Sequence, residues 1–409
     1  MTSVQLAEYR TTCGVELDVD QLRDLAALAP SVTVTPSITQ PGHWDLTPGP
    51  EVGIVVLGDT TLDIGPKIGI ERLMFLIAYV LDPVRWSDQL TSIAEADNPL
   101  DVLVPSFVAA LRSALGPGIL HGYRSIDDSS NVVRGRIRFG DQLRRRFSIS
   151  APIEVSFDEF TDDIDENRVL KAALRRLRRL PVRSRRLRRE LHHYDRSLAG
   201  VTSVDDAARD LPPITWTRLN ARYRHAVDLA KLVLRHSSIE RHPGVVNSSA
   251  FLVNMNDLFE DFVITALREQ LQVGHRTLVQ GAHGRSLHLD QADRVRLEPD
   301  LSWWNGGRCE FVGDCKYKRV NVAGIKHADL YQLLAYTTAT GLDEGLLIYA
   351  QGEAEPREHV VRFADKRLHV TAVNLSGSPD SILEEIARVG TLINSLRPGT
   401  GANATAQCV

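Results

Sequence analysis

Long apolar runs and paired cysteines are missing from this 409-residue sequence. The nearest candidate for a membrane span, residues 73–81, is far shorter than the roughly 20 residues required, and it predicts a buried helix. The four cysteines form no CxxC pair, which argues against a zinc site and a disulfide framework. The N-terminus is polar, with Glu8 and Arg10, and is unlike a signal peptide. We therefore expect a cytoplasmic protein.

The bulk composition is that of a folded globular protein, with 43% hydrophobic and 24% charged residues. The length favours two or three domains, because 409 residues exceed one ordinary core. Although the net charge is −4, positive charge is concentrated in a run of arginines. These arginines can contact DNA phosphates or a partner protein, or they can form a solvated helix face. This arginine run contains Arg175, Arg176, Arg178, Arg179, Arg183, Arg185, Arg186, Arg188 and Arg189.

Strand-like and helical patterns alternate in the first 240 residues. Residues 53–57 and 61–64 predict a hairpin, and residues 70–80 have the length of a helix. Residues 30–50, rich in Pro, Thr and Ser, predict a loop or an extended arm. Alternation within 131–157 predicts further strands. Helices are predicted over 167–179, 184–194 and 217–235.

A different order of elements begins after His242-Pro243-Gly244. Apolar residues at helical spacing are followed by two strands, a second helix and a buried strand. The order helix–strand–strand–helix–strand is typical of a small α/β nuclease core. These elements are predicted at 253–270, 297–304, 308–318, 329–339 and 345–349, and 358–363, 367–373 and 381–396 add two strands and a helix.

Two carboxylates and a lysine lie on the two adjacent strands of this region. Pro299-Asp300 precedes, and Asp314-x-Lys316 follows, the tight-turn signal Asn305-Gly306-Gly307. Carboxylates of this kind can hold Mg²⁺, or Mn²⁺ in its place, and the amine can orient or polarise an attacking water. The pattern therefore predicts metal-dependent cleavage of phosphodiesters, with Asp300 and Asp314 as metal ligands.

Strand periodicity predicts how these side chains face. Asp314 and Lys316 are two residues apart and share one face, with Cys315 on the other. If the turn has three residues, Asp300 pairs near Val312 and shares that face, whereas a slip of one residue turns it away. We expect the Cys315 side chain to pack against the sheet as a small hydrophobe, while its backbone carbonyl can add a metal ligand.

Residues on two flanking helices can complete the site. Glu260 precedes the strands and can supply a third carboxylate to the metal or hold a water nearby, although it can equally be a surface glutamate. Gln332 and Tyr336 are spaced i, i+4 and share a helix face, where they can support the lysine or the scissile strand. Ordinary amphipathicity, with Tyr336 in the core, explains that spacing equally well.

Read in order, Glu–(P)D–DxK–QxxxY resembles the PD-(D/E)xK nuclease superfamily in its RecB-like variant. Motifs along most of the chain resemble the McrC family more specifically. They are LxIxPK at 62–67, GRIRF at 135–139, FDEFTDDIDENRVLKAAL at 157–174, MNDLFEDFV at 255–263 and EPDL…GDCKYK at 298–318.

The McrC resemblance implies the nuclease subunit of a modification-dependent (type IV) restriction system. Proteins of this family work with an AAA+ GTPase, McrB, whose hexameric ring recognises 5-methylcytosine in double-stranded DNA. The resemblance implies that the N-terminal half docks into that ring and stimulates GTP hydrolysis, while paired C-terminal domains cut. This chain has no G-x-x-x-x-G-K-[ST] loop, so we expect GTP to be bound by the partner.

The expected fold is an α+β N-terminal region with β-rich and helical subdomains, followed by an α/β PD-(D/E)xK (restriction-endonuclease-like) nuclease domain. We place a β-rich partner-docking domain at 1–125, a connecting region with the arginine run at 126–240, the nuclease domain at 241–397 and a disordered tail at 398–409. Two other functions stay open. One is a stand-alone RecB-like exonuclease, which leaves residues 1–240 without a purpose. The other is a non-cleaving adaptor that activates an AAA+ NTPase.

Overall fold

The structure is a computed structural model, and it describes most of the chain. The predictions for Lys318 and for the tail after residue 398 lie outside the described residues. Within the described parts, no helix has both the length and the apolar character needed to cross a bilayer. The described residues are 2–81, 83, 86, 98–146, 151–204, 211–240, 248–281, 287–317, 327–350 and 357–398.

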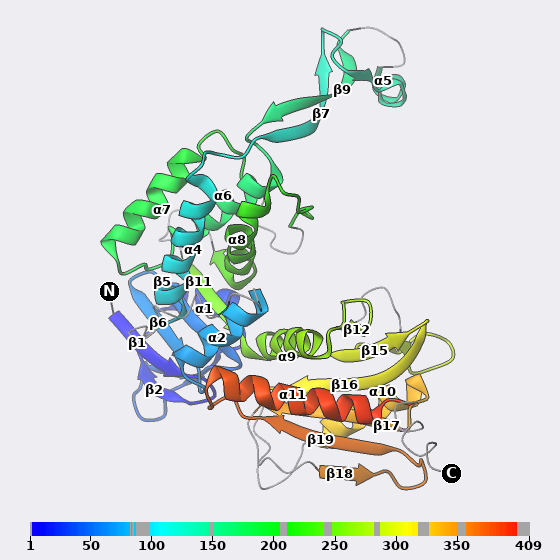
Figure 1. The fold of residues 1–409 in the computed structure, drawn as a ribbon. Coiled ribbons are helices and arrows are strands. Elements are labelled where there is room, and N and C mark those ends of the chain that lie inside the picture. Colours follow the sequence, from blue (N-terminus) through cyan, green and yellow to red (C-terminus); the bar gives the residue numbers. More distant parts are fainter. Residues whose placement is uncertain are drawn as a thin grey trace.

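A five-stranded sheet with the order β1-β6-β5-β11-β10 lies at the N-terminal end (Figure 1). The predicted hairpin is confirmed as β5 and β6, and β1 pairs parallel with β6. Strand β11 comes from far along the chain and pairs antiparallel with β5, so the predicted boundary at 240–241 falls between two paired strands of one sheet. The strands are β1 (Thr2–Ala7), β5 (Glu51–Leu57), β6 (Thr60–Gly65), β10 (Ser237–Glu240) and β11 (Ser248–Asn254).

A small three-stranded sheet and helix α1 (Val19–Leu28) accompany this sheet. The sheet has the order β2-β4-β3, with β2 at Thr12–Val15, β3 at Thr33–Pro36 and β4 at Trp44–Thr47. The prediction of a loop over residues 30–50 is therefore wrong in part. The Thr and Val residues of this stretch suit a half-buried pleated surface, and this preference outweighs the flanking prolines.

In the described part of the chain, five helices form the next layer, and the predicted ones are confirmed. Helix α8 begins several residues later than predicted, because the Asn220 side chain closes a turn in front of it. Asn220 Oδ1 accepts a hydrogen bond from the Thr217 amide at 2.7 Å, and Nδ2 donates to the Thr215 carbonyl at 2.9 Å. The helices are α2 (Ile70–Leu81), α4 (Pro99–Leu115), α6 (Asp165–Leu177), α7 (Arg185–Ser197) and α8 (Arg224–His236).

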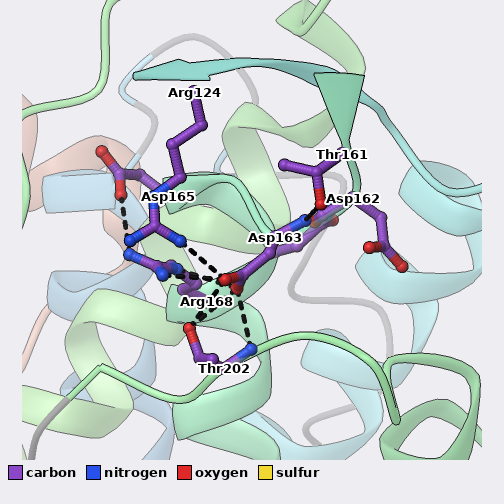
Figure 2. A network of polar contacts seen from close by, with 8 residues as sticks. Arg124, Thr161, Asp162, Asp163, Asp165, Arg168 and Thr202 are labelled. Carbon is purple, nitrogen blue, oxygen red and sulfur yellow. Dashed lines mark hydrogen bonds and ion pairs between the residues drawn. The ribbon is translucent and has the colours of Figure 1, made fainter. Parts of the chain in front are cut away.

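An arm made of β7 (Gly122–Ser130), β8 (Arg136–Ile137), α5 (Phe139–Arg146) and β9 (Ile153–Thr161) projects from these helices (Figure 1). Strands predicted within 131–157 are thus present in part, with a short helix between them. Asp163 fixes the base of the arm (Figure 2). Its carboxylate accepts hydrogen bonds from Arg124 at 2.7 Å, from Arg168 at 2.8 Å and from the Thr202 amide at 2.8 Å.

Replacement of Asp163 should destabilise the protein at neutral pH. Hydrogen bonds from Arg168 hold the pKa of Asp163 well below its usual range, so this carboxylate stabilises the fold above the unfolded pKa and loses that contribution as pH falls. We expect Asp163→Asn to lower the free energy of unfolding by about 2–3 kcal/mol in urea at pH 7. The deficit should shrink below a pH of about 4. Asp162→Asn is the matched control, and equal losses for both variants would contradict this role.

The C-terminal region is a six-stranded sheet with the order β12-β15-β16-β17-β19-β18. Strands β16, β17 and β19 run parallel, and the others are antiparallel. Helices α9 and α11 contact one face and α10 the other. The bounds are β12 (Leu278–Val279), β15 (Leu301–Asn305), β16 (Arg308–Lys316), β17 (Glu344–Ala350), β18 (Arg357–Val360), β19 (Arg367–Val373), α9 (Met255–Leu271), α10 (His327–Thr340) and α11 (Pro379–Leu396).

Helix α9 joins the two halves through one continuous core. It contacts α2 on the N-terminal side and β16 and α11 on the C-terminal side (Figure 1). Phe262 meets the rings of Phe75 and Tyr79 at 5.6 and 5.5 Å, while Phe259 faces Tyr317 at 6.2 Å. The predicted mixed α/β architecture is confirmed, and its C-terminal sheet shares a core with the layers before it.

Candidate active site

The hairpin β15–β16 sets the register of the predicted site. Gly306 and Gly307 form a two-residue turn with φ of +53° and +93°, a left-handed conformation that favours glycine. The turn is therefore one residue shorter than the predicted three. A bulge between Trp303 and Trp304 adds a residue on β16, so that Leu301 lies opposite Gly313.

Continuing this register places Asp300 opposite Asp314 instead of near Val312. Val312 and Asp314 are two residues apart, so the Asp300 side chain lies on the predicted face of the strand pair. The Cys315 amide donates a hydrogen bond to Asp300 Oδ2 at 2.8 Å, which fixes this carboxylate across the strand pair.

Three predicted site residues meet at this edge of the sheet. Lys316 Nζ lies 2.5 Å from Asp314 Oδ2 and 3.9 Å from Asp300 Oδ2. Asp314 is fully buried, whereas the Asp300 and Lys316 side chains keep 17% and 18% of their exposure, so these two side chains are the solvent-accessible part of the cluster. Asp314 Oδ1 is buried and accepts no hydrogen bond from the described residues.

Glu260 approaches the same site from α9. Burial and the neighbouring carboxylate of Asp257 raise the pKa of Glu260 to about 7, and Asp314 adds to this while Lys316 opposes it. Burial, and then the charge of Asp300, likewise raise the pKa of Asp314 to about 7. Burial lowers the pKa of Lys316, but its pairing with Asp314 outweighs burial and raises that pKa overall. Several carboxylates thus share one ammonium, and a cation would relieve the excess negative charge.

The donor set fits a hard divalent cation in part. Among the described residues, no group of three or more His, Cys, Asp or Glu side chains is arranged to hold a metal ion. The predicted ligands Asp300, Asp314 and Glu260 are therefore not assembled as one triad here, since the Lys316 ammonium is the counter-ion of Asp314. The carboxylates of Asp300 and Asp314 remain adjacent. Asp314 Oδ1 is a buried acceptor without a donor among the described residues, which suits a ligand of Mg²⁺.

Gln332 and Tyr336 lie behind this site on α10. Gln332 Nε2 donates to Tyr336 Oη at 2.7 Å, and Tyr336 Oη donates to the Glu298 carbonyl at 3.1 Å. Burial raises the pKa of Tyr336 to about 12, and the charge of Asp314 contributes to this rise. Tyr336 is thus both a core residue and an anchor for the backbone two residues before Asp300.

Loss of the Tyr336 hydroxyl should slow, without removing, the DNA cleavage that the sequence predicts. Tyr336→Phe leaves the Glu298 carbonyl without its donor and loosens the segment that carries Asp300. We expect about tenfold slower DNA cleavage and a stability loss of about 1 kcal/mol, measured by initial rates and urea unfolding. Tyr331→Phe, on an exposed tyrosine of the same helix, is the control and should change neither quantity. Wild-type cleavage by Tyr336→Phe would remove Tyr336 from the site.

Cys315 faces away from the carboxylates, as predicted. It is 1% exposed and belongs to the core on the α9 and α11 side, whereas Val312 and Leu347 pack toward α10. Burial raises the pKa of its thiol well above the usual value, so a thiolate ligand is disfavoured.

The arginine run lies on α6, α7 and the turn between them, away from the hairpin (Figure 1). Arg176 is buried, and three others form ion pairs within the chain: Arg178 with Asp195, Arg183 with Asp101 and Arg186 with Glu190. Part of the run therefore holds helices together. Exposed residues of the run for which the described part of the chain shows no acidic partner are Arg175, Arg185, Arg188 and Arg189.

Sequence reasoning missed Asp257, which lies three residues before Glu260 on α9. Burial raises the pKa of Asp257, and the charge of Asp257 is the largest of the charge effects on the pKa of Glu260. The i, i+3 spacing of these two acids on one helix is the signal that could have indicated it.

The fold and the site define a multi-sheet α/β protein with an acid–lysine cluster at the end of strand β16 in a mixed sheet. A sequence profile described as McrBC 5-methylcytosine restriction system component matches residues 46–350. The chain belongs to this family, which confirms the resemblance found in the sequence, and it is a component of a restriction system. A comparison with curated protein sequences gave no match.

Two solved structures are similar to this chain. One is a half-complex from a tetradecameric assembly of Thermococcus gammatolerans McrB AAA+ hexamers with bound McrC, with a TM-score of 0.55 and 18% identity over 95% of this chain and 100% of that chain. The other is the Thermococcus gammatolerans McrBC complex, with a TM-score of 0.42 and 21% identity over 66% and 88%. The first similarity supports the overall fold.

Proposed function

We propose that this chain is the nuclease subunit of a modification-dependent, McrBC-like restriction complex that hydrolyses DNA phosphodiesters with Mg²⁺. The observation that carries the proposal is the cluster of Asp300, Asp314 and Lys316 on one face of a hairpin. Family membership supports the restriction system. A sheet with α9 and α10 on opposite faces and the acids on its central hairpin supports a PD-(D/E)xK fold for the C-terminal region.

Asp300 and Asp314 would hold the Mg²⁺, with Glu260 and the Cys315 carbonyl as further oxygen donors. When bound, the ion supplies Lewis acidity at the scissile phosphate and lowers the pKa of water. Lys316 orients the attacking water and stabilises negative charge developing on the phosphate. In the metal-free site Glu260 can hold a proton near neutral pH, because burial and the charge of Asp257 raise its pKa to about 7. The Cys315 amide keeps Asp300 in place throughout.

We further propose that an McrB-like AAA+ GTPase is the partner. The similar solved structure is described as McrB AAA+ hexamers with bound McrC, and its similarity covers 95% of this chain. In this proposal the partner binds GTP and reads the modified base, and the layers before α9 dock against it. Because α9 connects those layers to the C-terminal sheet, docking of the partner can affect the site that contains Asp300, Asp314 and Lys316.

A cleavage assay with and without the partner tests the proposed function. Supercoiled plasmid containing 5-methylcytosine is incubated with the purified chain and Mg²⁺, alone and with the AAA+ protein from the same genome and GTP. We expect linear product only in the complete mixture. Cutting of the plasmid by the chain alone would favour a stand-alone endonuclease, and degradation of the same plasmid after linearisation, by the chain alone, would favour a stand-alone exonuclease. GTPase stimulation without cutting would favour a non-cleaving adaptor.

A further inference from the structure

Three residues from distant parts of the chain meet beside the hairpin. Glu8 follows β1, Lys67 follows β6, and Tyr317 directly follows Lys316 at the end of β16. Glu8 Oε2 accepts hydrogen bonds from the Lys67 amide at 3.2 Å and from Tyr317 Oη at 3.4 Å. Lys67 Nζ lies 3.7 Å from Glu8 Oε1 and 4.0 Å from the centre of the Tyr317 ring. The cluster thus ties the N-terminal sheet to the strand that carries Lys316.

Two members of this cluster, Glu8 and Tyr317, are buried, while the Lys67 side chain keeps 25% of its exposure. The Glu8 side chain has no exposed surface, and Tyr317 is 1% exposed. A buried carboxylate is costly unless it is paired, and the charge of Lys67 compensates Glu8 while its ammonium also lies over an aromatic face. Tyr9, the residue after Glu8, has a φ of +59°, a left-handed conformation that strains a non-glycine residue. The fold therefore keeps the contact between the N-terminal sheet and Tyr317 at the cost of backbone strain at Tyr9.

The other side of Tyr317 leads to the helix of Glu260. The Tyr317 ring lies 6.2 Å from the ring of Phe259, which is adjacent to Glu260 on α9. Successive residues of a strand point to opposite faces, so Tyr317 anchors the strand on the face opposite Lys316. Because Tyr317 is held between Lys67 and Phe259, the orientation of the strand at Lys316 is held as well.

We propose that Glu8, Lys67 and Tyr317 are positioning residues that hold Lys316 in its working orientation and couple it to the N-terminal sheet. This inference rests on the proposed nuclease function. Lys67 and Glu8 belong to the ends of β6 and β1, so a shift of that sheet changes the support of Tyr317 and, through it, Lys316. Positioning accounts for a buried carboxylate, Glu8, that is paired with a partly exposed lysine beside a strained backbone residue and that the chemistry itself does not use.

The test compares Lys67→Met with Lys67→Arg in the full chain. Met keeps the length and the apolar stem but removes the charge, whereas Arg keeps both the charge and the stacking on Tyr317. We expect Lys67→Met to lower the cleavage rate at saturating DNA roughly 100-fold with unchanged DNA affinity, and Lys67→Arg to restore most of it. Arg23→Met, in an exposed ion pair of α1, is the control. The assay uses methylated plasmid, Mg²⁺, the AAA+ partner and GTP, with thermal unfolding recorded for every variant.

The outcomes separate this inference from the proposed function. Absence of cutting by the wild-type chain would overturn the nuclease assignment itself, and wild-type cutting by Lys316→Ala would overturn the assignment of the site to Lys316. Wild-type cutting by a folded Lys67→Met, with Lys316→Ala inactive, would overturn only the positioning role. If Lys67→Met does not fold, Tyr317→Phe decides, because it keeps the ring and removes only the hydrogen bond to Glu8. That variant should cut about tenfold more slowly, and an unchanged rate would overturn the role.

Discussion

Lys316→Ala should abolish DNA cleavage while leaving the protein assembled. The Lys316 ammonium is the cationic side chain paired with both Asp314 and Asp300, and it is partly exposed on the side where a phosphate would bind. Removing a preorganised charge from such a site costs about 10³-fold in rate. The measurement is the initial rate of plasmid linearisation with Mg²⁺, the AAA+ partner and GTP. Stimulation of the partner's GTPase should stay at the wild-type level, because Lys316 lies in the C-terminal sheet.

Two controls make this result specific. Arg308→Ala removes an exposed cation from the other end of the same strand and should cut normally. Lys316→Arg keeps the charge but replaces a compact ammonium with a planar fork, so we expect only partial activity. Cutting at the wild-type rate by Lys316→Ala would show that the cluster is structural. Loss of GTPase stimulation together with cleavage would instead indicate a general folding defect.

Local patterns predicted most helices and strands, because the periodicity of apolar residues depends on neighbours in the sequence. The face of Asp300 was predicted correctly although the turn length was wrong. A two-residue turn with a bulge and the predicted three-residue turn differ by two positions in register, and a difference of two preserves the face of a strand. The bulge at Trp303 and Trp304 carries no signal of its own in the sequence.

Long-range contacts were not predictable in the same way. The pairing of β11 with β5 joins residues that no local pattern connects, so a domain boundary was placed between two strands of one sheet. The arginine run left open contacts with DNA phosphates, contacts with a partner protein or a solvated helix face, yet Arg178 and Arg183 pair with acids on other elements. The contact of Lys67 with Tyr317 likewise depends on how two distant motifs meet in space. The sequence motifs drew attention to segments such as the one containing Lys67, but only the fold shows which distant residues they contact.

Asp314→Asn should produce a protein that is inactive and also insensitive to Mg²⁺. Asp314 is fully buried beside Asp300, and the two carboxylates share the Lys316 ammonium. Burial raises the pKa of Asp314 to about 7, which shows that its charge is poorly compensated without a further cation. A neutral amide removes that charge while keeping the shape. We therefore expect cleavage to fall about 10³-fold, with the stability of the metal-free protein equal to or above that of the wild type.

The stability readout tests the metal site independently of catalysis. An ion that binds only the folded wild-type chain stabilises it by about 2.7 kcal/mol at a concentration 100 times its Kd. Wild-type protein should therefore unfold at a higher temperature as Mg²⁺ is added, and Asp314→Asn should not. Glu298→Gln, an exposed acid near the same hairpin, is the matched control and should keep the Mg²⁺ response. A full Mg²⁺ response by Asp314→Asn would place the cation elsewhere, and the buried acid would then serve only to hold Lys316.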